Sequence, residues 1–379
     1  MRVLNHVAFE SYWGTHVPCN VLDLDEGPTV GGGEEAGLRA AVGLTALGHS
    51  VETWWYGGAG TWRGAVFHSL QDSFYPEVIS QEWDVVIGWS GLKALEWAQK
   101  RKDGTYPIRA MAQQLNDLTC RGDWSKVDCI ISPSKSHAEQ LSIWGWKNKP
   151  HAVVHNGLDP EKYANAPAWA DRPYDVGYWS SPDRGLHHLL MAWPLVRAAE
   201  PRAKLHVFYE IDRYLRGGVG SIGLYGDRAR LLAHLVPRAK LDPSIIFHGA
   251  IPRNQLAPIQ KRCRVHCYPY DTIQFCEGFA GAVNQGIAAG CLVMTTPKDA
   301  LPSLYGDTIH WMPDAGESAQ ANANYFRWLA SQIVLGLHGE LPNQAQTLAN
   351  AKVKGMRYTW DAAALEMECA CKGEGWVTL

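Results

Sequence analysis

Apolar and β-branched residues form short runs along the first half of the chain, and longer segments with helical spacing separate these runs. In residues 34–48, Leu38, Ala41 and Val42 recur on one helix face, and Gly48 supplies a C-terminal stop. The strands predicted for this half are residues 2–7, 51–56, 84–88, 108–112, 129–132 and 152–155. Strands that alternate with helices predict a parallel, doubly wound sheet in an α/β fold.

The same alternation restarts after residues 157–174, which contain three prolines and no clean period and are therefore interpreted as a linker. The strands predicted beyond it are residues 175–178, 205–209, 245–248, 265–268, 292–295 and 309–312, and the helices are residues 185–200, 223–239, 254–262, 280–289 and 320–335. We therefore expect two α/β domains, residues 1–156 and 175–355, that face each other across a cleft. Ligands of such sheets bind at the carboxyl ends of the strands.

Composition places the chain among ordinary globular proteins. It has 379 residues, of which 46% are hydrophobic, and a formal net charge of -3 that provides no global attraction to phosphate polymers. No apolar run approaches the roughly 18 residues of a membrane span, and the N-terminus lacks the layout of a signal peptide, which predicts a cytoplasmic protein. The nine cysteines lack zinc-site spacing, so reduced thiols and no metal site are expected.

Three consecutive glycines, Gly31, Gly32 and Gly33, directly precede the first predicted helix. Glycine lets a ligand approach the backbone closely, and the free N–H groups of a helix start favour an anion such as a diphosphate. Glu34 and Glu35 in the first turn also suit the helix dipole without any ligand. The loop is therefore either a diphosphate contact or an ordinary helix start.

A second helix start, in the other half of the chain, carries a cation. Arg184 and Gly185 begin the helix of residues 185–200, with Ser181 and Asp183 as candidate caps. A forked guanidinium at a helix start can clamp phosphate oxygens. The alternative for Arg184 is a surface ion pair.

The stretch CEGFAGAVNQG places one acid, Glu277, directly before the glycine-rich turn of residues 278–281. Gln285 follows about two helical turns later, roughly 80° round the helix, so both side chains can reach one ligand. A carboxylate at this place can accept hydrogen bonds from sugar hydroxyls while backbone amides and Arg184 hold phosphates. The alternative for Glu277 is an interaction with the helix dipole.

These stretches, in this order, resemble the GT-B glycosyltransferases, most closely the retaining family 4 group, and the resemblance covers most of the chain. HNGLDPEKY is similar to the signature that closes the family's N-terminal domain, and SSPDRGLHHLLMAW is similar to its Lys-Gly helix start with Arg184 in place of lysine. CEGFAGAVNQGIAAGCLV matches the E-x7-E motif, with Gln285 at the second acid. The resemblance implies two Rossmann-like domains and a C-terminal helix, within residues 356–379, that crosses back to the first domain.

The resemblance also implies a role for each matching residue. The implied catalytic residues are Glu277 and Arg184; the donor diphosphate and sugar are held by Gly32, Gly33, Gly278, Phe279, Ala280 and Gly281; the nucleoside is held by Gln285, Gly249, Ile251 and Arg253. The family often carries a histidine near the acceptor, and the candidates in its place are Trp89, Gln113 and Asn116.

The sequence thus predicts a retaining glycosyltransferase whose donor is a nucleotide-diphosphate sugar, with a UDP-sugar first, and which needs no metal or other cofactor. The default acceptor is a glycan, lipid or small-molecule hydroxyl. The 17 tryptophans offer stacking surfaces for an extruded base, so a hydroxymethylated pyrimidine in phage DNA is the alternative acceptor. Two further alternatives are a nucleotide-sugar-binding module without transfer activity, suggested by Gln285, and a nucleotide-sugar epimerase.

Overall fold

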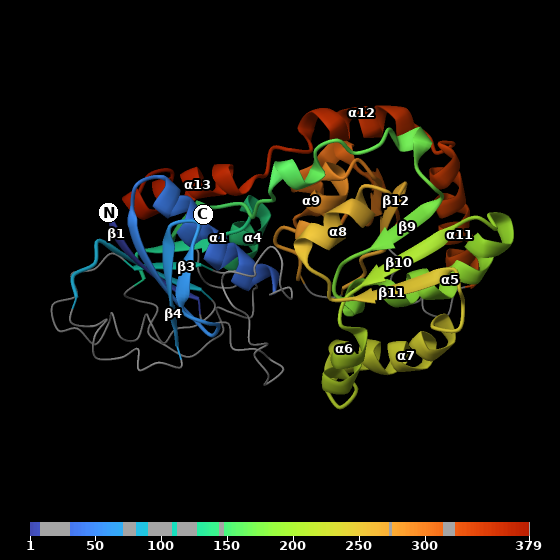
Figure 1. Cartoon of the computed structure of the whole chain (residues 1–379), viewed down its shortest axis with the longest axis horizontal. Helices are drawn as coiled ribbons and strands as arrows, with labels where there is room; N and C mark the ends of the chain where they lie inside the picture. The colour runs from blue at the N-terminus through green and yellow to red at the C-terminus, as the bar shows by residue number, and fades with distance from the viewer. Residues whose placement is uncertain are drawn as a thin grey trace. The chain divides into compact units, whose positions relative to one another are not determined.

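A computed structural model describes residues 1–7, 31–70, 81–89, 108–111, 127–143, 148–272, 275–313 and 323–378 (Figure 1). The chain divides into two compact units. Unit 1 comprises Met1–Leu158, Phe275–Gly281 and Tyr358–Leu379, and unit 2 comprises Asp159–Gln274 and Ala282–Arg357. Each unit contains a sheet with parallel strands and covering helices, so the predicted α/β fold class is confirmed.

Unit 1 is built on a sheet with the strand order β15-β8-β7-β6-β5-β1-β2-β4-β3. Neighbouring strands are parallel except for two pairs, β15 with β8 and β3 with β4. The strands are β1 (Arg2–Val7), β2 (Ser50–Trp55), β3 (Gly60–Trp62), β4 (Ala65–Ser69), β5 (Val85–Trp89), β6 (Ile108–Met111), β7 (Cys129–Ser132), β8 (Pro150–Val153) and β15 (Val377–Thr378). The β3–β4 hairpin was not predicted, because its turn depends on positive φ at Arg63 and Gly64.

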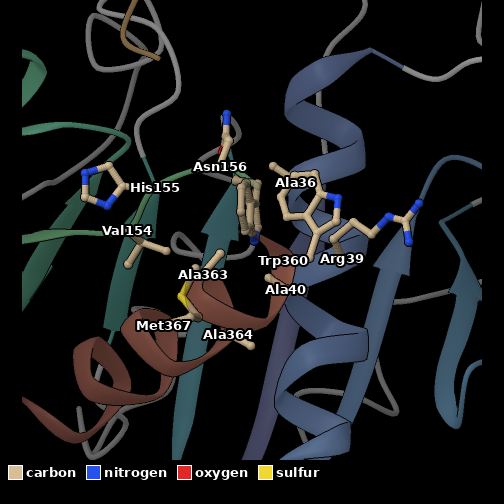
Figure 2. Close-up of a pocket in the computed structure, with 11 residues that line it drawn as sticks. Ala36, Arg39, Ala40, Val154, His155, Asn156, Trp360, Ala363, Ala364 and Met367 are labelled. Carbon is tan, nitrogen blue, oxygen red and sulfur yellow. The ribbon is translucent and has the colours of Figure 1, made fainter. Parts of the chain in front are cut away.

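The helices of unit 1 are α1 (Gly32–Ala46), α4 (Lys135–Leu141) and α13 (Trp360–Lys372). Leu38 and Ala41 on the predicted apolar face of α1 are fully buried in the core of the unit. Helix α1 also packs against α13, and Ala40 of α1 and Ala363 and Ala364 of α13 lie in this region (Figure 2). A Cβ on Gly43 would collide with Ala364 of α13, so the close approach of the two helices requires glycine there.

Unit 2 is built on a six-stranded sheet with the order β11-β10-β9-β12-β13-β14, and all its strands are parallel. The strands are β9 (Asp175–Tyr178), β10 (Lys204–Phe208), β11 (Ile245–Gly249), β12 (Val265–Tyr268), β13 (Leu292–Thr295) and β14 (His310–Trp311). The chain starts in the middle of the sheet, proceeds to one edge, and then crosses to the other side. This is the topology of a doubly wound nucleotide-binding sheet.

The helices of unit 2 cover both faces of this sheet (Figure 1). They are α5 (Leu186–Ala199), α6 (Ile211–Gly218), α7 (Gly223–Ala239), α8 (Arg253–Gln260), α9 (Gly281–Ala288), α10 (Leu301–Tyr305), α11 (Ala323–His338) and α12 (Gln344–Lys354). The prediction matches β9, β12, β13 and α7 to the residue, and it missed α6, α10 and α12. None of the helices in the described ranges has the length and apolar character that a membrane span requires.

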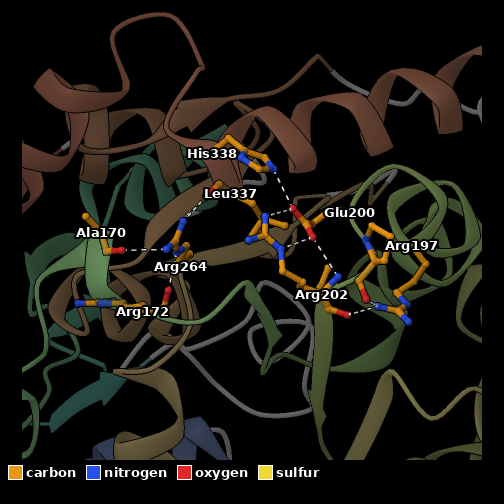
Figure 3. Close-up of polar contacts among 10 residues, drawn as sticks. Ala170, Arg172, Arg197, Glu200, Arg202, Arg264, Leu337 and His338 are labelled. Atoms are coloured by element: carbon orange, nitrogen blue, oxygen red, sulfur yellow. Dashed lines mark hydrogen bonds and ion pairs between the residues drawn. The ribbon is translucent and has the colours of Figure 1, made fainter.

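The segment predicted as a linker, residues 157–174, contains two short 3-10 helices, Pro160–Tyr163 and Trp169–Asp171, and its second half is fastened to unit 2. Arg264 donates three hydrogen bonds to main-chain oxygens, those of Ala170 (2.8 Å), Arg172 (2.7 Å) and Leu337 (2.8 Å) (Figure 3). One buried guanidinium therefore joins this segment to helix α11.

Candidate functional site

The direction of the chain in unit 2 reverses between β9 and β12, and doubly wound sheets bind ligands at such a point. The segments that follow these strands contain the predicted Arg184 and Gly185 on one side and Pro269 on the other. Gly185 has φ +110°, and a Cβ on it would collide with the Pro269 carbonyl oxygen. Glycine is thus required for both reasons, and the two segments meet at the place where doubly wound sheets bind ligands.

Arg184 closes a short 3-10 helix, Pro182–Arg184, that leads into α5. Its side chain is 12% exposed, its Nε lies 3.5 Å from a carboxylate oxygen of Asp183, and its guanidinium lies 6.0 Å from the ring centre of Tyr270. The turn before it is held by Tyr178, whose hydroxyl donates to the Ser181 carbonyl oxygen at 2.6 Å. Arg184 therefore stands at the carboxyl end of β9, and its contact with a diphosphate stays a prediction.

A buried charged cluster that the sequence analysis missed lies close to the carboxyl end of β12. Asp271, three residues after β12, accepts from Arg228 of α7 at 2.6 Å and bonds with His188 Nε2 of α5 at 2.5 Å. Arg228 also donates to His187, whose pKa is lowered well below its usual value by burial and by its positive neighbours. The network thus ties the start of α5 and helix α7 to the turn that leads from β12 toward Glu277.

His187, His188 and Asp271 offer ligand atoms of the kind that hold metal ions, all within 4.8 Å of one another. The guanidinium of Arg228 already contacts two of them, so a divalent cation would meet a fixed positive charge. We interpret the cluster as an ion-pair network. Its sequence signals are a pair of histidines inside an apolar helix pattern and an acid at the end of a buried strand.

The segment that carries Glu277 is anchored inside unit 1. Phe279 is 3% exposed, and its ring centre lies 5.3 Å from that of Tyr358 and 6.3 Å from that of His155. Gly278 is packed so closely that a Cβ would lie 3.0 Å from the imidazole of His137. Glu277 itself is half-buried, and Ala280, at the end of the turn, has φ +58°. The side chains of this segment therefore fix its backbone, which is the part predicted to face the diphosphate.

Helix α9, which follows this turn, is held on the sheet of unit 2 by Trp179. The indole N–H donates to the Ala282 carbonyl oxygen at 2.8 Å, and the ring stacks on His266 with centres 3.9 Å apart. Two turns after Glu277, the side-chain oxygen of Gln285 accepts from Gln260 at 3.1 Å. This bond fixes the orientation of the Gln285 amide, and its contact with a ribose stays a prediction.

The predicted nucleoside residues lie at the carboxyl end of β11. Gly249 ends that strand with φ +72°, and Arg253 begins α8. Glu210, which follows β10, accepts from the Ala250 amide at 3.0 Å, so the ends of β10 and β11 are joined beside the residues expected to contact the base. Ile251 lies in the connection between Gly249 and Arg253 and is half-buried.

The candidates of the first half lie in unit 1. Gly32 and Gly33 form the first turn of α1, and the amide of Gly31 donates to Glu34 at 2.6 Å, as expected of an ordinary helix start. Trp89 is 1% exposed, and its indole N–H donates to Asn5 at 2.7 Å, so its ring and its polar atom both belong to the core. Gln113 and Asn116 lie outside the described residues. Acceptor contacts by these three side chains stay predictions.

A pocket in unit 1 lies between α1, α13 and the residues after β8 (Figure 2). Its polar side chains are already engaged: Arg39 lies 3.7 Å from the carboxylate of Glu35, and His155 lies 2.9 Å from the carboxylate of Glu366. Apolar side chains form most of its remaining wall, so it offers no evident catalytic group.

Comparisons with known proteins bear on the fold. No protein-family model matches the chain, and no curated protein matches its sequence. Among solved structures, sucrose-phosphate synthase from Thermosynechococcus elongatus aligns with a TM-score of 0.66 and 15% identity, over 98% of this chain and 99% of that one. HepE from Anabaena, in complex with UDP, aligns with a TM-score of 0.65 and 13% identity, over 98% of this chain and 100% of that one.

AviGT4, a glycosyltransferase involved in avilamycin A biosynthesis, aligns with a TM-score of 0.59 and 14% identity, over 98% of each chain. These neighbours are similar along their whole length, and each consists of two Rossmann-like domains. At such identities the similarity is one of architecture. The chain therefore has the GT-B fold.

Proposed function

We propose that this protein is a retaining glycosyltransferase of the family 4 type that transfers a sugar from a UDP-sugar to an acceptor hydroxyl. The observation that carries the proposal is the place of Glu277, directly before the turn that opens α9, in a chain with the GT-B fold. The choice of UDP is supported by the neighbour HepE, whose solved complexes hold UDP and UDP-glucose.

In this proposal the departing diphosphate is stabilised by the Arg184 guanidinium and by the backbone amides at the start of α9. Both are fixed before the reaction: Arg184 by the turn that follows β9, and α9 by Trp179. Fixed positive groups stabilise developing negative charge without the cost of reorienting solvent. The Arg184 guanidinium and these backbone amides thus stabilise the leaving group.

Glu277 accepts hydrogen bonds from the donor sugar, and its negative charge favours the positive charge that develops at the anomeric carbon. The acceptor hydroxyl attacks from the face that the diphosphate leaves, and the configuration is retained. Gln285 contacts the ribose with the amide that Gln260 orients. The acceptor hydroxyl belongs by default to a glycan, a lipid or a small molecule.

Thermal unfolding in the presence of UDP-, GDP-, ADP- and TDP-sugars tests the donor. A bound donor stabilises the protein by about 2.7 kcal/mol at a hundredfold excess over its dissociation constant. We expect a clear shift with one or more UDP-sugars. A folded protein that responds to none of them would contradict the proposal.

The variant Glu277→Gln tests the chemistry, because it keeps the shape of the side chain and removes its charge. We expect kcat to fall by about 10²- to 10³-fold, the cost of losing one group that stabilises the transition state, while the donor still raises the melting temperature. Glu340→Gln, at an exposed acid, serves as the control. The acceptor panel contains glycans, lipids and hydroxymethylated DNA; donor binding without transfer to any of them would favour a binding module.

A further inference from the structure

Tyr209, directly after β10, has a backbone conformation that is nearly confined to glycine. Its φ is +144°, and side chains in this region are rare because the conformation is strained. Hydrogen bonds on both sides impose it: the Tyr209 amide donates to the Gly249 carbonyl oxygen at 3.0 Å, and the Ile211 amide donates to the Tyr209 carbonyl oxygen at 2.9 Å. The β10–β11 register also shifts here, so that Phe208 pairs with Gly249. A glycine would satisfy the same backbone without strain.

Core packing does not explain why a large aromatic residue occupies this position, because the Tyr209 residue is 39% exposed. Its hydroxyl lies close to the Ser181 side chain, three residues before Arg184, and its ring lies edge-on to Tyr214 with centres 6.5 Å apart. The residue thus extends from the end of β11, where its backbone is bonded, to the turn after β9, where its hydroxyl lies. It spans the carboxyl edge of the sheet between the predicted nucleoside loop and the predicted phosphate cation.

Strained non-glycine residues concentrate at ligand sites, and the carboxyl edge of a doubly wound sheet is where nucleotides bind. An aromatic ring held there by its two ends offers a flat apolar face, on which a base of any type can stack. We propose that Tyr209 is the stacking platform for the nucleobase of the donor and contributes to donor affinity. This inference rests on the proposed function and adds to it a binding residue that lies outside the family-like motifs.

The charge of the site agrees with this assignment. Burial raises the pKa of Tyr209, and the nearby carboxylate of Asp183 raises it further, so the hydroxyl stays protonated at neutral pH. The ring therefore places no negative charge beside a diphosphate. Stacking of a bound nucleobase on the ring would explain why a strained tyrosine, and not a glycine, occupies this position.

Three variants at this one position separate ligand binding from backbone strain. Tyr209→Phe keeps the ring, Tyr209→Ala removes the ring but keeps a Cβ at positive φ, and Tyr209→Gly removes both the ring and the strain. Dissociation constants are measured by calorimetry with UDP and with inorganic pyrophosphate, which has no base. Thermal unfolding without ligand gives the stability of each variant.

We expect the Tyr209→Ala and Tyr209→Gly variants to weaken UDP binding equally, by about 5- to 150-fold. This range corresponds to the free energy of stacking one base on an aromatic side chain. Pyrophosphate binding should stay within about twofold of the wild type in both, and Phe should bind UDP almost as the wild type does. Gly should melt at a higher temperature than Ala, because it relieves the strain. A purely structural role of Tyr209 would not weaken UDP binding equally in two variants that differ in stability.

Three results would overturn the proposal. UDP affinity of the Ala and Gly variants at the wild-type value would show that the ring does not contact the nucleotide. Affinity losses that follow melting temperature, with Ala worse than Gly, would assign Tyr209 a structural role. An equal loss of pyrophosphate and UDP binding would place it at the phosphates. If the wild-type protein itself binds no nucleotide, the proposed function fails first and the role of Tyr209 falls with it.

Discussion

The exchange of Arg228 for methionine should be among the most destabilising single changes in unit 2. Arg228 Nη2 lies 2.6 Å from Asp271 Oδ2, and the two side chains are 5% and 4% exposed. Methionine has a similar length and high helix propensity, so it preserves α7 and removes the charge. Asp271 would then remain buried with the imidazoles of His188, at 2.5 Å, and His187, at 3.7 Å, beside its carboxylate. A buried carboxylate that loses its partner destabilises a protein by about 3–5 kcal/mol.

The same helix supplies a matched control. Arg230, two residues further on, contacts Asp227 at the same 2.6 Å, but these side chains are 46% and 68% exposed. An exposed pair contributes about 0–1 kcal/mol, because water screens the charges and both side chains lose conformational freedom. The two ion pairs have the same 2.6 Å separation, and the two exchanges have nearly equal effects on helix propensity. Arg230→Met also removes hydrogen bonds to the Val219 and Ser221 carbonyl oxygens, each 3.0 Å long. We expect Arg228→Met to be more destabilising by about 2–5 kcal/mol, because the carboxylate that it leaves without a guanidinium is buried.

Equilibrium unfolding in urea, followed by circular dichroism, gives the free energy of each variant. The set contains Arg228→Met, Arg230→Met, Asp271→Asn and the double variant at positions 228 and 271. We expect the double variant to be more stable than the sum of its single changes predicts, since removing both charges leaves no unpaired ion. If Arg228→Met loses no more stability than Arg230→Met, the buried ion pair does not stabilise unit 2 and the reasoning is refuted.

Two further predictions concern unit 2. The Arg202 guanidinium lowers the pKa of Glu200 from 4.5 to about 2 (Figure 3), so the ionised carboxylate stabilises the fold above pH 4.5 and this contribution is lost as the pH falls toward 2. Glu200→Gln should melt below the wild type at pH 7 and approach it at about pH 2.5; a difference independent of pH would contradict this. Gly185→Ala should lower both the melting temperature and the donor affinity, because the new Cβ collides with Pro269. The control Gly220→Ala, at a residue with open space around it, should leave donor affinity unchanged. Equal donor affinities of the two variants would show that Gly185 is not required.

The repeating elements were predictable because each is encoded locally. β1, β7, β9, β12 and β13 were predicted to the residue, since buried parallel strands appear as short continuous apolar runs with clear limits. The β3–β4 hairpin was missed, because its turn depends on positive φ at Arg63 and Gly64 and each of its strands depends on a partner strand.

Some residues of the candidate site were likewise predictable from the sequence, and others were not. Arg184 and Gly185 were predicted from a helix start, and the structure places them beside Pro269 at the switch point of the sheet. Tyr209 carried no sequence signal, because the positive φ that makes it unusual is imposed by hydrogen bonds to a neighbouring strand. For Trp89, the resemblance suggested an acceptor contact, which stays a prediction, and its burial is a property of the packed core.

The sequence by itself determined the alternation of strands and helices, the two-part organisation and the glycine-rich turns, because spacing and backbone preference act over a few residues. Tertiary structure decided which polar residues share a site. In the stretch Asp227-Arg228-Ala229-Arg230, nothing local distinguishes the two arginines. One is buried against Asp271 and the other is exposed beside Asp227, because the buried side of α7 is set by its contacts with α5 and α6.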